Sequence, residues 1–190
     1  MGYNYYGQLG DGTTTQRATP VQVGSGVIAM AAGYEHSLFI KSDGTLWAMG
    51  SNFYGQLGDG TTAQRTTPVQ VTSGVNAVAA GYRYSLFVKS DGTLWAMGSN
   101  TYGQLGDGTT TNRSTPVQVA SGVTAVAAGF YHSLFVKSDG TLWAMGLNNY
   151  GQLGDGSTES RSTPVQVGTG ALSVAGGQYH TVAIFAAENP

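Results

Sequence analysis

Short apolar segments separated by glycine turns dominate the chain, and this pattern predicts β-strands throughout. The segments HSLFIKS and TLWAMG, at 36–42 and 45–50, flank an Asp-Gly pair. Asp-Gly between two such segments is typical of a hairpin with a type I′ turn, in which both turn residues have positive φ. No stretch carries an apolar period of about 3.6 residues long enough to predict a helix. Hairpins are therefore expected around Asp43-Gly44, Asp91-Gly92 and Asp139-Gly140.

Two further segments complete a unit of four predicted strands. TPVQV, at 67–71, has its proline near the start, where a missing backbone N–H is tolerated. VNAVAAG, at 75–81, follows the turn TSG. Four short strands in about 48 residues, repeated along a chain, are typical of a β-propeller blade. If the strand that contains SLF is the innermost strand of the blade, the residues just before it lie beside the central opening.

The whole unit recurs four times with a constant step. Gly7, Gly55, Gly103 and Gly151 stand at equal intervals, and nearly all the residues between them recur as well. We therefore expect an all-β fold, a β-propeller built from four four-stranded blade repeats within a single repeat domain spanning 1–190. The repeat units run approximately over 1–48, 49–96, 97–144 and 145–190.

Composition narrows the classes of partner. Charged residues make up 9 % of the chain and the formal net charge is −2, against roughly 25 % charged residues in ordinary domains. Eight scattered basic residues do not form the cluster that a phosphate backbone requires, so we expect no nucleic-acid partner. No segment resembles a signal peptide or a transmembrane helix, and we expect no membrane partner. The chain has no cysteine, which excludes disulfides and thiolate chemistry.

The repeat resembles that of a known family. The order AAGxxHSLFxKSDGTLWAMGxNxYGQLGDGTTxxRxTPVQV is similar to the repeat of the regulator of chromosome condensation family, above all to its short bacterial versions, which include a propeller-type β-lactamase inhibitor protein. The resemblance covers Gly2 to about Phe185 and implies a propeller of usually seven blades. The eukaryotic member acts on a small nuclear GTPase and sits on chromatin, but that activity depends on special loops, and no copy here has such an insertion.

The loop YGQLGDGTT could form a phosphate cradle, a calcium loop or a turn. A phosphate loop needs a lysine after the glycines and a helix behind them, whereas this loop has no lysine and leads into a strand. A calcium loop needs several oxygen ligands, and each copy has one carboxylate. We therefore expect turns without a bound metal, in which the aspartates cap backbone amides and the leucines pack between blades. These residues are Asp11, Asp59, Asp107, Asp155, Leu9, Leu57, Leu105 and Leu153.

Two further residue types recur at one register and have both a structural and a binding interpretation. Trp47, Trp95 and Trp143 are expected to pack between blades, although exposed rings could instead stack on sugars. The arginines are expected to hold the loop through its carbonyls or its aspartate, although a ring of four cations could instead bind an anion. They are Arg17, Arg65, Arg113 and Arg161.

The third recurring position carries histidine in three copies and tyrosine in one. A catalytic or metal-binding role would not readily accept that exchange, so we expect a side-chain hydrogen bond within the blade. The two positions before it vary most among otherwise nearly identical copies. Tyrosine and phenylalanine with isolated charges are typical of protein-recognition surfaces, although exposed positions also vary without function. The candidate binding residues are Tyr34, Glu35, His36, Tyr82, Arg83, Tyr84, Phe130, Tyr131, His132, Gln178, Tyr179 and His180.

These features favour a non-enzymatic scaffold or protein-interaction module that binds through the variable rim near the central opening. No nucleophile, base and orienting group stand together outside the repeat register, so we expect neither enzymatic activity nor a cofactor. Two alternatives stay open. One is a lectin-like or enzymatic site for a glycan or small ligand at the centre of the ring. The other is a repeat-array fragment without a selected partner.

The register of the ends bears on how a ring could close. Met1 lies in the register of Met49, and the next tryptophan of the series would follow Pro190 directly. Unpaired strand edges and apolar blade faces are therefore expected at both ends. Four blades would have to meet at about 90°, whereas eight meet at about 45°. We expect a homodimer that closes an eight-bladed ring, and the alternatives are a four-bladed monomer or a fragment of a longer propeller.

Overall fold

Glycine turns divide the chain into 14 β-strands in the computed structural model, which describes residues 1–187. The strands form antiparallel sheets, each in chain order from its inner to its outer strand. The first sheet contains β1 (Val27–Ala32), β2 (His36–Lys41), β3 (Leu46–Gly50) and β4 (Arg65–Thr72). The second contains β5 (Val75–Ala80), β6 (Tyr84–Lys89), β7 (Leu94–Gly98) and β8 (Arg113–Ala120). The third contains β9 (Val123–Ala128), β10 (His132–Lys137), β11 (Leu142–Gly146) and β12 (Arg161–Gly168), and the fourth contains β13 (Ala171–Gly176) and β14 (Thr181–Phe185).

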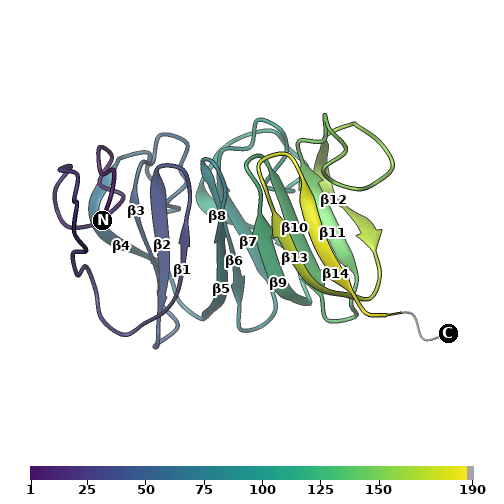
Figure 1. Ribbon diagram of the computed structural model, residues 1–190, viewed down its shortest axis with the longest axis horizontal. Coiled ribbons are helices and arrows are strands. Elements are labelled where there is room, and N and C mark those ends of the chain that lie inside the picture. The colour runs from purple at the N-terminus through teal and green to yellow at the C-terminus, as the bar shows by residue number, and fades with distance from the viewer. Residues whose placement is uncertain (188–190) are drawn as a thin grey trace.

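The sheets stand side by side as successive propeller blades, and the first and last sheets lie at opposite ends of the row (Figure 1). The all-β propeller prediction is confirmed, but only three of the four sheets have four strands. The segment 17–24 has the sequence of an outer strand such as β4, yet within residues 1–187 it pairs only through the isolated bridge between Gly2 and Arg17.

The innermost strand of each blade is the one that begins the sheet. Contacts between sheets run from β1 to β5, from β5 to β9 and from β9 to β13. The strand that contains SLF is the second of each sheet, so the condition considered above, that this strand is innermost, is not met. The repeat period defines the unit but not the strand at which a blade begins. The variable positions still lie at the end of the innermost strand, because they join it to the second strand.

The Asp-Gly hairpins use a different turn from the one expected. Gly92 has a positive φ of 79°, but no residue other than glycine does among those described. The Gly92 N–H donates to the Lys89 carbonyl and the Lys89 N–H to the Thr93 carbonyl, both at 2.9 Å. This is a three-residue loop with a type I turn and a glycine bulge. Asp91 keeps negative φ and accepts hydrogen bonds from the backbone and hydroxyl of Thr93.

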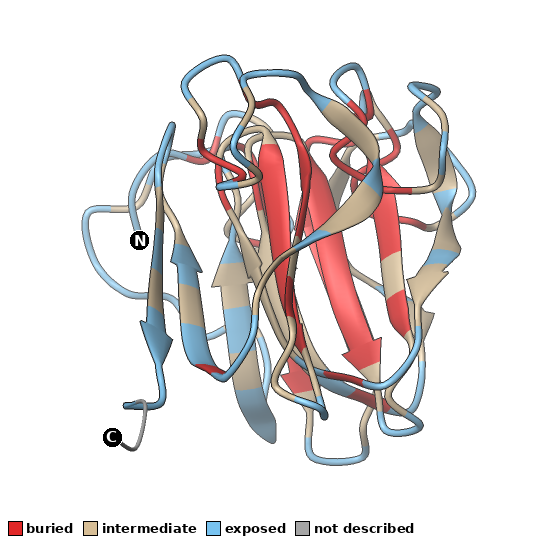
Figure 2. Ribbon diagram, turned by 90° about the vertical axis from the view of Figure 1, so that its right-hand side faces the viewer, coloured by how far each residue is buried: buried red, intermediate tan, exposed pale blue. Residues whose placement is uncertain are grey.

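Apolar side chains from adjacent sheets form the core. We call the sheet surface toward the next blade its forward face and the opposite surface its backward face. Ile40 on the forward face of the first sheet and Val78 on the backward face of the second belong to one cluster. Val88 and Val126 take the same places at the second interface, and Val136 and Val174 at the third. In Figure 2, buried strands fill the middle of the molecule, and the strand that leads to the C-terminus is pale blue and tan.

Two of the three tryptophans take part in this packing between blades, as the sequence predicts, whereas Trp47 belongs to none of the clusters between blades. Trp95 packs against the first interface cluster and Trp143 against the second. Trp95 stacks on Phe87 with ring centroids 6.3 Å apart, and its indole N–H donates to Thr93 Oγ1 at 2.9 Å.

The YGQLGDGTT loops are turns that their own side chains hold, which confirms the structural interpretation. Asp59 Oδ1 accepts the backbone N–H of Thr61 at 3.0 Å, and Asp59 Oδ2 pairs with the Arg65 guanidinium at 2.6 Å. Leu57 is completely buried in the first interface cluster. The same aspartate–arginine pair recurs in the other three loops.

No helix long and apolar enough to cross a bilayer occurs among residues 1–187.

Candidate functional site

The residues that follow the innermost strands gather at one end of the blades. Tyr34, Tyr82, Phe130 and Gln178, which we call the inner row, line one hollow of about 280 Å³. The ring centroids of Tyr34 and Tyr82 are 4.6 Å apart, and those of Tyr82 and Phe130 are 4.2 Å apart. The backbone N–H of Tyr82 donates to the carbonyl of Phe130 at 3.1 Å. Three successive blades thus contribute aromatic rings to one surface, and Tyr34 remains 58 % exposed.

The next residue in each copy points away from the hollow, toward the preceding YGQLGDGTT loop. Tyr131 packs on Tyr102 of that loop at 5.0 Å between ring centroids, and Tyr179 packs on Tyr150 at 5.2 Å. We call this second set the outer row, and its members are Glu35, Arg83, Tyr131 and Tyr179. The inner row, the outer row and the loop tyrosines together form the aromatic rim.

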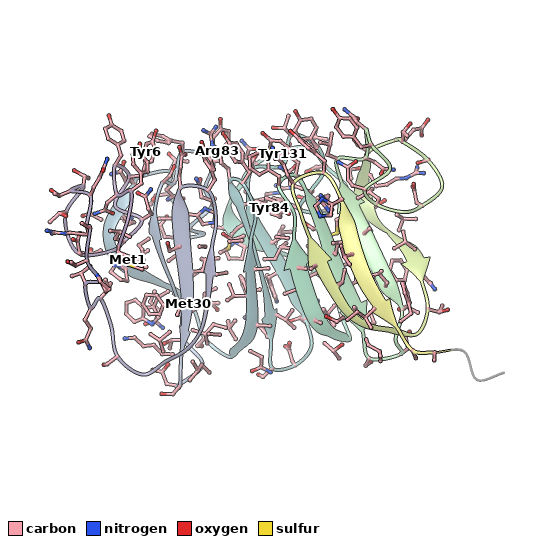
Figure 3. All side chains as sticks on the ribbon, in the orientation of Figure 1. Met1, Tyr6, Met30, Arg83, Tyr84 and Tyr131 are labelled. Carbon is pink, nitrogen blue, oxygen red and sulfur yellow. The ribbon has the colours of Figure 1, made fainter. Side chains whose placement is uncertain are left out.

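Arg83 lies at the centre of the aromatic rim. Its Nη1 donates to the Tyr54 hydroxyl at 3.0 Å, and its guanidinium lies over the rings of Tyr82 and Tyr54, at 4.6 and 5.0 Å from their centroids. Its Nη2 is 3.6 Å from Oε2 of the nearly buried Glu35. Figure 3 shows Arg83, Tyr6 and Tyr131 along the same edge of the molecule. The rim therefore presents one partly exposed cation among tyrosines.

The surroundings of two rim tyrosines, Tyr6 and Tyr131, raise the pKa of their hydroxyls and so favour the neutral form. The Glu35 carboxylate raises the pKa of the Tyr6 hydroxyl above its ordinary value. Burial raises the pKa of Tyr131. Both residues therefore act as hydroxyl donors and acceptors at neutral pH.

The histidine position does not belong to this surface in the first three copies. His36, Tyr84 and His132 are at most 1 % exposed, so these three candidate binding residues contribute nothing to the exposed surface of the rim. The expected hydrogen bond forms, but it crosses to the next blade. His36 Nε2 is 2.9 Å from Ser85 Oγ, and His132 Nε2 is 3.1 Å from Thr181 Oγ1.

Tyr84 makes an equivalent bond by donating its hydroxyl to the backbone carbonyl of His132 in the next blade. These side chains therefore tie adjacent blades together rather than strands of one blade. His180 is exposed, because among the described residues no sheet follows β14.

Sequence reasoning missed the loop tyrosines as members of the rim. Tyr54, Tyr102 and Tyr150 stand at the start of a loop that is almost identical in all copies, so variation among copies did not mark them. Tyr150 is 72 % exposed. An aromatic residue that begins a glycine-rich turn, ahead of the leucine that is buried, is the signal that could have identified them.

No group of three or more histidine, aspartate or glutamate side chains suited to a metal ion occurs in the described part of the chain.

Comparison with known proteins identifies the repeat. The family model described as RCC1-like domain matches residues 1–189. No curated protein sequence matches the chain significantly.

Several solved structures share the fold. The crystal structure of human WBSCR16 superposes with a TM-score of 0.88 at 24 % identity, over 99 % of this chain and 53 % of that one. Prp20p from Saccharomyces cerevisiae, described with its binding to Gsp1p and histones, has a TM-score of 0.76 at 21 % identity, over 86 % of this chain and 45 % of that one. Yeast RCC1 (Prp20), in a crystal structure with Kap60, has a TM-score of 0.77 at 23 % sequence identity. The match covers 93 % of this chain and 46 % of that one. The chain thus spans about half the length of these structures.

Proposed function

The chain belongs to the RCC1-like domain family, and from that premise we propose that it is a non-enzymatic propeller module that binds a partner protein through the aromatic rim. The fold commonly mediates protein interactions. Two similar structures fit this proposal, since one is described with binding to Gsp1p and histones and another contains Kap60.

The observation that carries the proposal is the gathering of rings from successive blades on one surface. Tyr34, Tyr82 and Phe130 contact one another although each belongs to a different repeat unit. Rigid aromatic side chains bring large contact area at a small entropic cost, and tyrosine and arginine are enriched where binding energy concentrates. Arg83 stacks on Tyr82 and on the loop residue Tyr54, so its guanidinium is already oriented before a partner arrives.

Several ionisable groups outside the rim are engaged in structural contacts. The loop aspartates pair with arginines of the same loops. His36 and His132 are buried and contact hydroxyls of the next blade. These contacts leave the rim as the favoured place for recognition.

A capture experiment tests the proposal. The wild-type chain and Tyr34→Ala are immobilised and exposed to an extract of the source organism and to a glycan array. Asn76→Ala is the control, because Asn76 is exposed on β5 away from the rim. We expect one protein to bind in stoichiometric amount to wild type and control and at least ten-fold less to Tyr34→Ala.

Two outcomes contradict the proposal. Equal capture by Tyr34→Ala would show that the partner binds elsewhere. Glycan binding that Tyr34→Ala abolishes, without any captured protein, would instead favour the second candidate, a ligand site in the 280 Å³ hollow between the aromatic rings.

A further inference from the structure

The two outermost sheets expose apolar faces that are equivalent to surfaces buried inside the protein. Met30 on the backward face of the first sheet is 79 % exposed. On the forward face of the β13–β14 sheet, Val182 is 58 % and Ile184 is 60 % exposed. Figure 3 shows Met30 in the part of the row farthest from the C-terminal sheet. We propose that these two faces bind each other between two copies of the chain, head to tail.

The internal interfaces predict which residues would meet. Each contains one forward-face residue of the second strand and one backward-face residue of the first strand of the next sheet. The pairs are Ile40 with Val78, Val88 with Val126, and Val136 with Val174. One repeat unit after Val136, the forward-face residue is Ile184, and one repeat unit before Val78, the backward-face residue is Met30. The fourth pair of the series is therefore Ile184 of one copy with Met30 of another.

The shapes of the two ends are complementary as well. A hollow of about 450 Å³ lies against the first sheet, and Leu9, Val23, Met30 and Phe39 line part of it. Leu9 and Val23 occupy the register of Leu57 and Val71, which cover the outer part of the first internal interface. On the backward face of the first sheet, Leu9 and Val23 therefore cover the outer strands, whereas no described strand packs against the inner strands β1 and β2. Among residues 1–187, the β13–β14 sheet consists of the two strands at the inner positions of a blade.

A polar contact supports the same register. His36 contacts Ser85 of the next blade at 2.9 Å, and His132 contacts Thr181 at 3.1 Å. His180 is exposed and has no following blade among the described residues. In the head-to-tail pair its equivalent partner is Ser37 of the second copy. Since each copy has one face of each kind, two copies satisfy both faces through two identical seams and close a ring.

The mass in solution is the first test, and its result does not depend on the rim. Sedimentation velocity and light scattering on the purified chain at micromolar concentration are expected to show a species of twice the mass of one chain. A monomer that persists at 100-fold higher concentration would overturn the proposal. Assemblies that grow beyond two copies would overturn the closed pair.

A charge exchange provides the matched test. Met30→Glu and Ile184→Lys each place an unpaired charge in both seams, so each variant alone is expected to pair at least about 100-fold more weakly than wild type. Asn76→Glu, an exposed change on an internal blade, is expected to leave pairing unchanged. Circular dichroism checks that each variant is folded, which is expected because both changed side chains are largely exposed.

Mixing the two variants then distinguishes this interface from any other. In a mixed pair, one seam contains the introduced glutamate opposite the introduced lysine and the other seam is unaltered, so a one-to-one complex is expected to form. Failure of the mixture to associate, or pairing of Met30→Glu with itself as tightly as wild type, would show that these faces do not bind each other.

Discussion

Replacing the two buried histidines with tyrosine should remove a pH dependence of stability that the blade interfaces create. Burial lowers the pKa of His36 and of His132 to about 4, against about 6.5 in an unfolded chain. The folded state therefore binds fewer protons than the unfolded state between these values. The free energy of unfolding is therefore highest above pH 6.5, where both states have neutral histidines. It decreases as pH falls toward 4, because the unfolded state gains protons that the folded state does not bind.

The size of the effect follows from the two pKa values. At pH 5 the unfolded chain is almost fully protonated at each site and the folded chain is mostly not, so each histidine costs about 2 kcal/mol relative to pH 7. The two sites together lower the free energy of unfolding by about 4 kcal/mol. Aspartate titration adds little in this window, because the pKa values of the loop aspartates, such as Asp59, are lowered and lie below it.

The chain itself supplies the control side chain. Tyr84 occupies the equivalent position and donates its hydroxyl to a carbonyl of the next blade, and burial raises its pKa. The double variant His36→Tyr, His132→Tyr should fold and should lose the slope. Urea unfolding at constant ionic strength between pH 7 and pH 5 measures both proteins. A flat wild-type profile, or an equal slope in the double variant, would refute the reasoning.

Three further predictions concern single residues. Gly92→Val should lower the free energy of unfolding by more than about 1 kcal/mol in urea titration, because Gly92 has a φ of 79°; a change near zero would contradict the turn. Leu105→Ala should cost about 2 to 5 kcal/mol by the same measurement, because Leu105 is completely buried between blades; a cost below about 1 kcal/mol would show that the site is not packed. Millimolar calcium should leave the melting temperature unchanged, since Asp59 is already paired with Arg65 and Thr61. A rise of several degrees that Asp59→Asn abolishes would reveal a metal site.

The repeat made most of the fold predictable. Strand identity, the leucines buried in three of the four loops and the aspartate–arginine pair all followed from residue types at a fixed register. The position of a strand within the blade did not follow, because a period is the same wherever one begins to count. Only contacts between β1, β5, β9 and β13 reveal which strand is innermost.

The candidate site was predictable in part. Variation among copies identified Tyr34, Tyr82 and Phe130, which do lie together. It could not separate exposed from buried positions that are neighbours in sequence, so Tyr84 was included although it is completely buried. In a strand, adjacent side chains point to opposite faces, and which face meets the next blade is a tertiary property.

The equivalence of the blade interfaces has an evolutionary consequence. Because Ile40, Val88 and Val136 meet nearly the same surface in the next blade, a gene that gains or loses one repeat unit creates no new kind of contact. Unequal recombination between such similar units therefore changes the curvature required of the ring while leaving each seam chemically intact. Selection on the number of blades then acts through whether the circle can close, whereas selection on binding acts through the few positions of the rim where the copies have diverged.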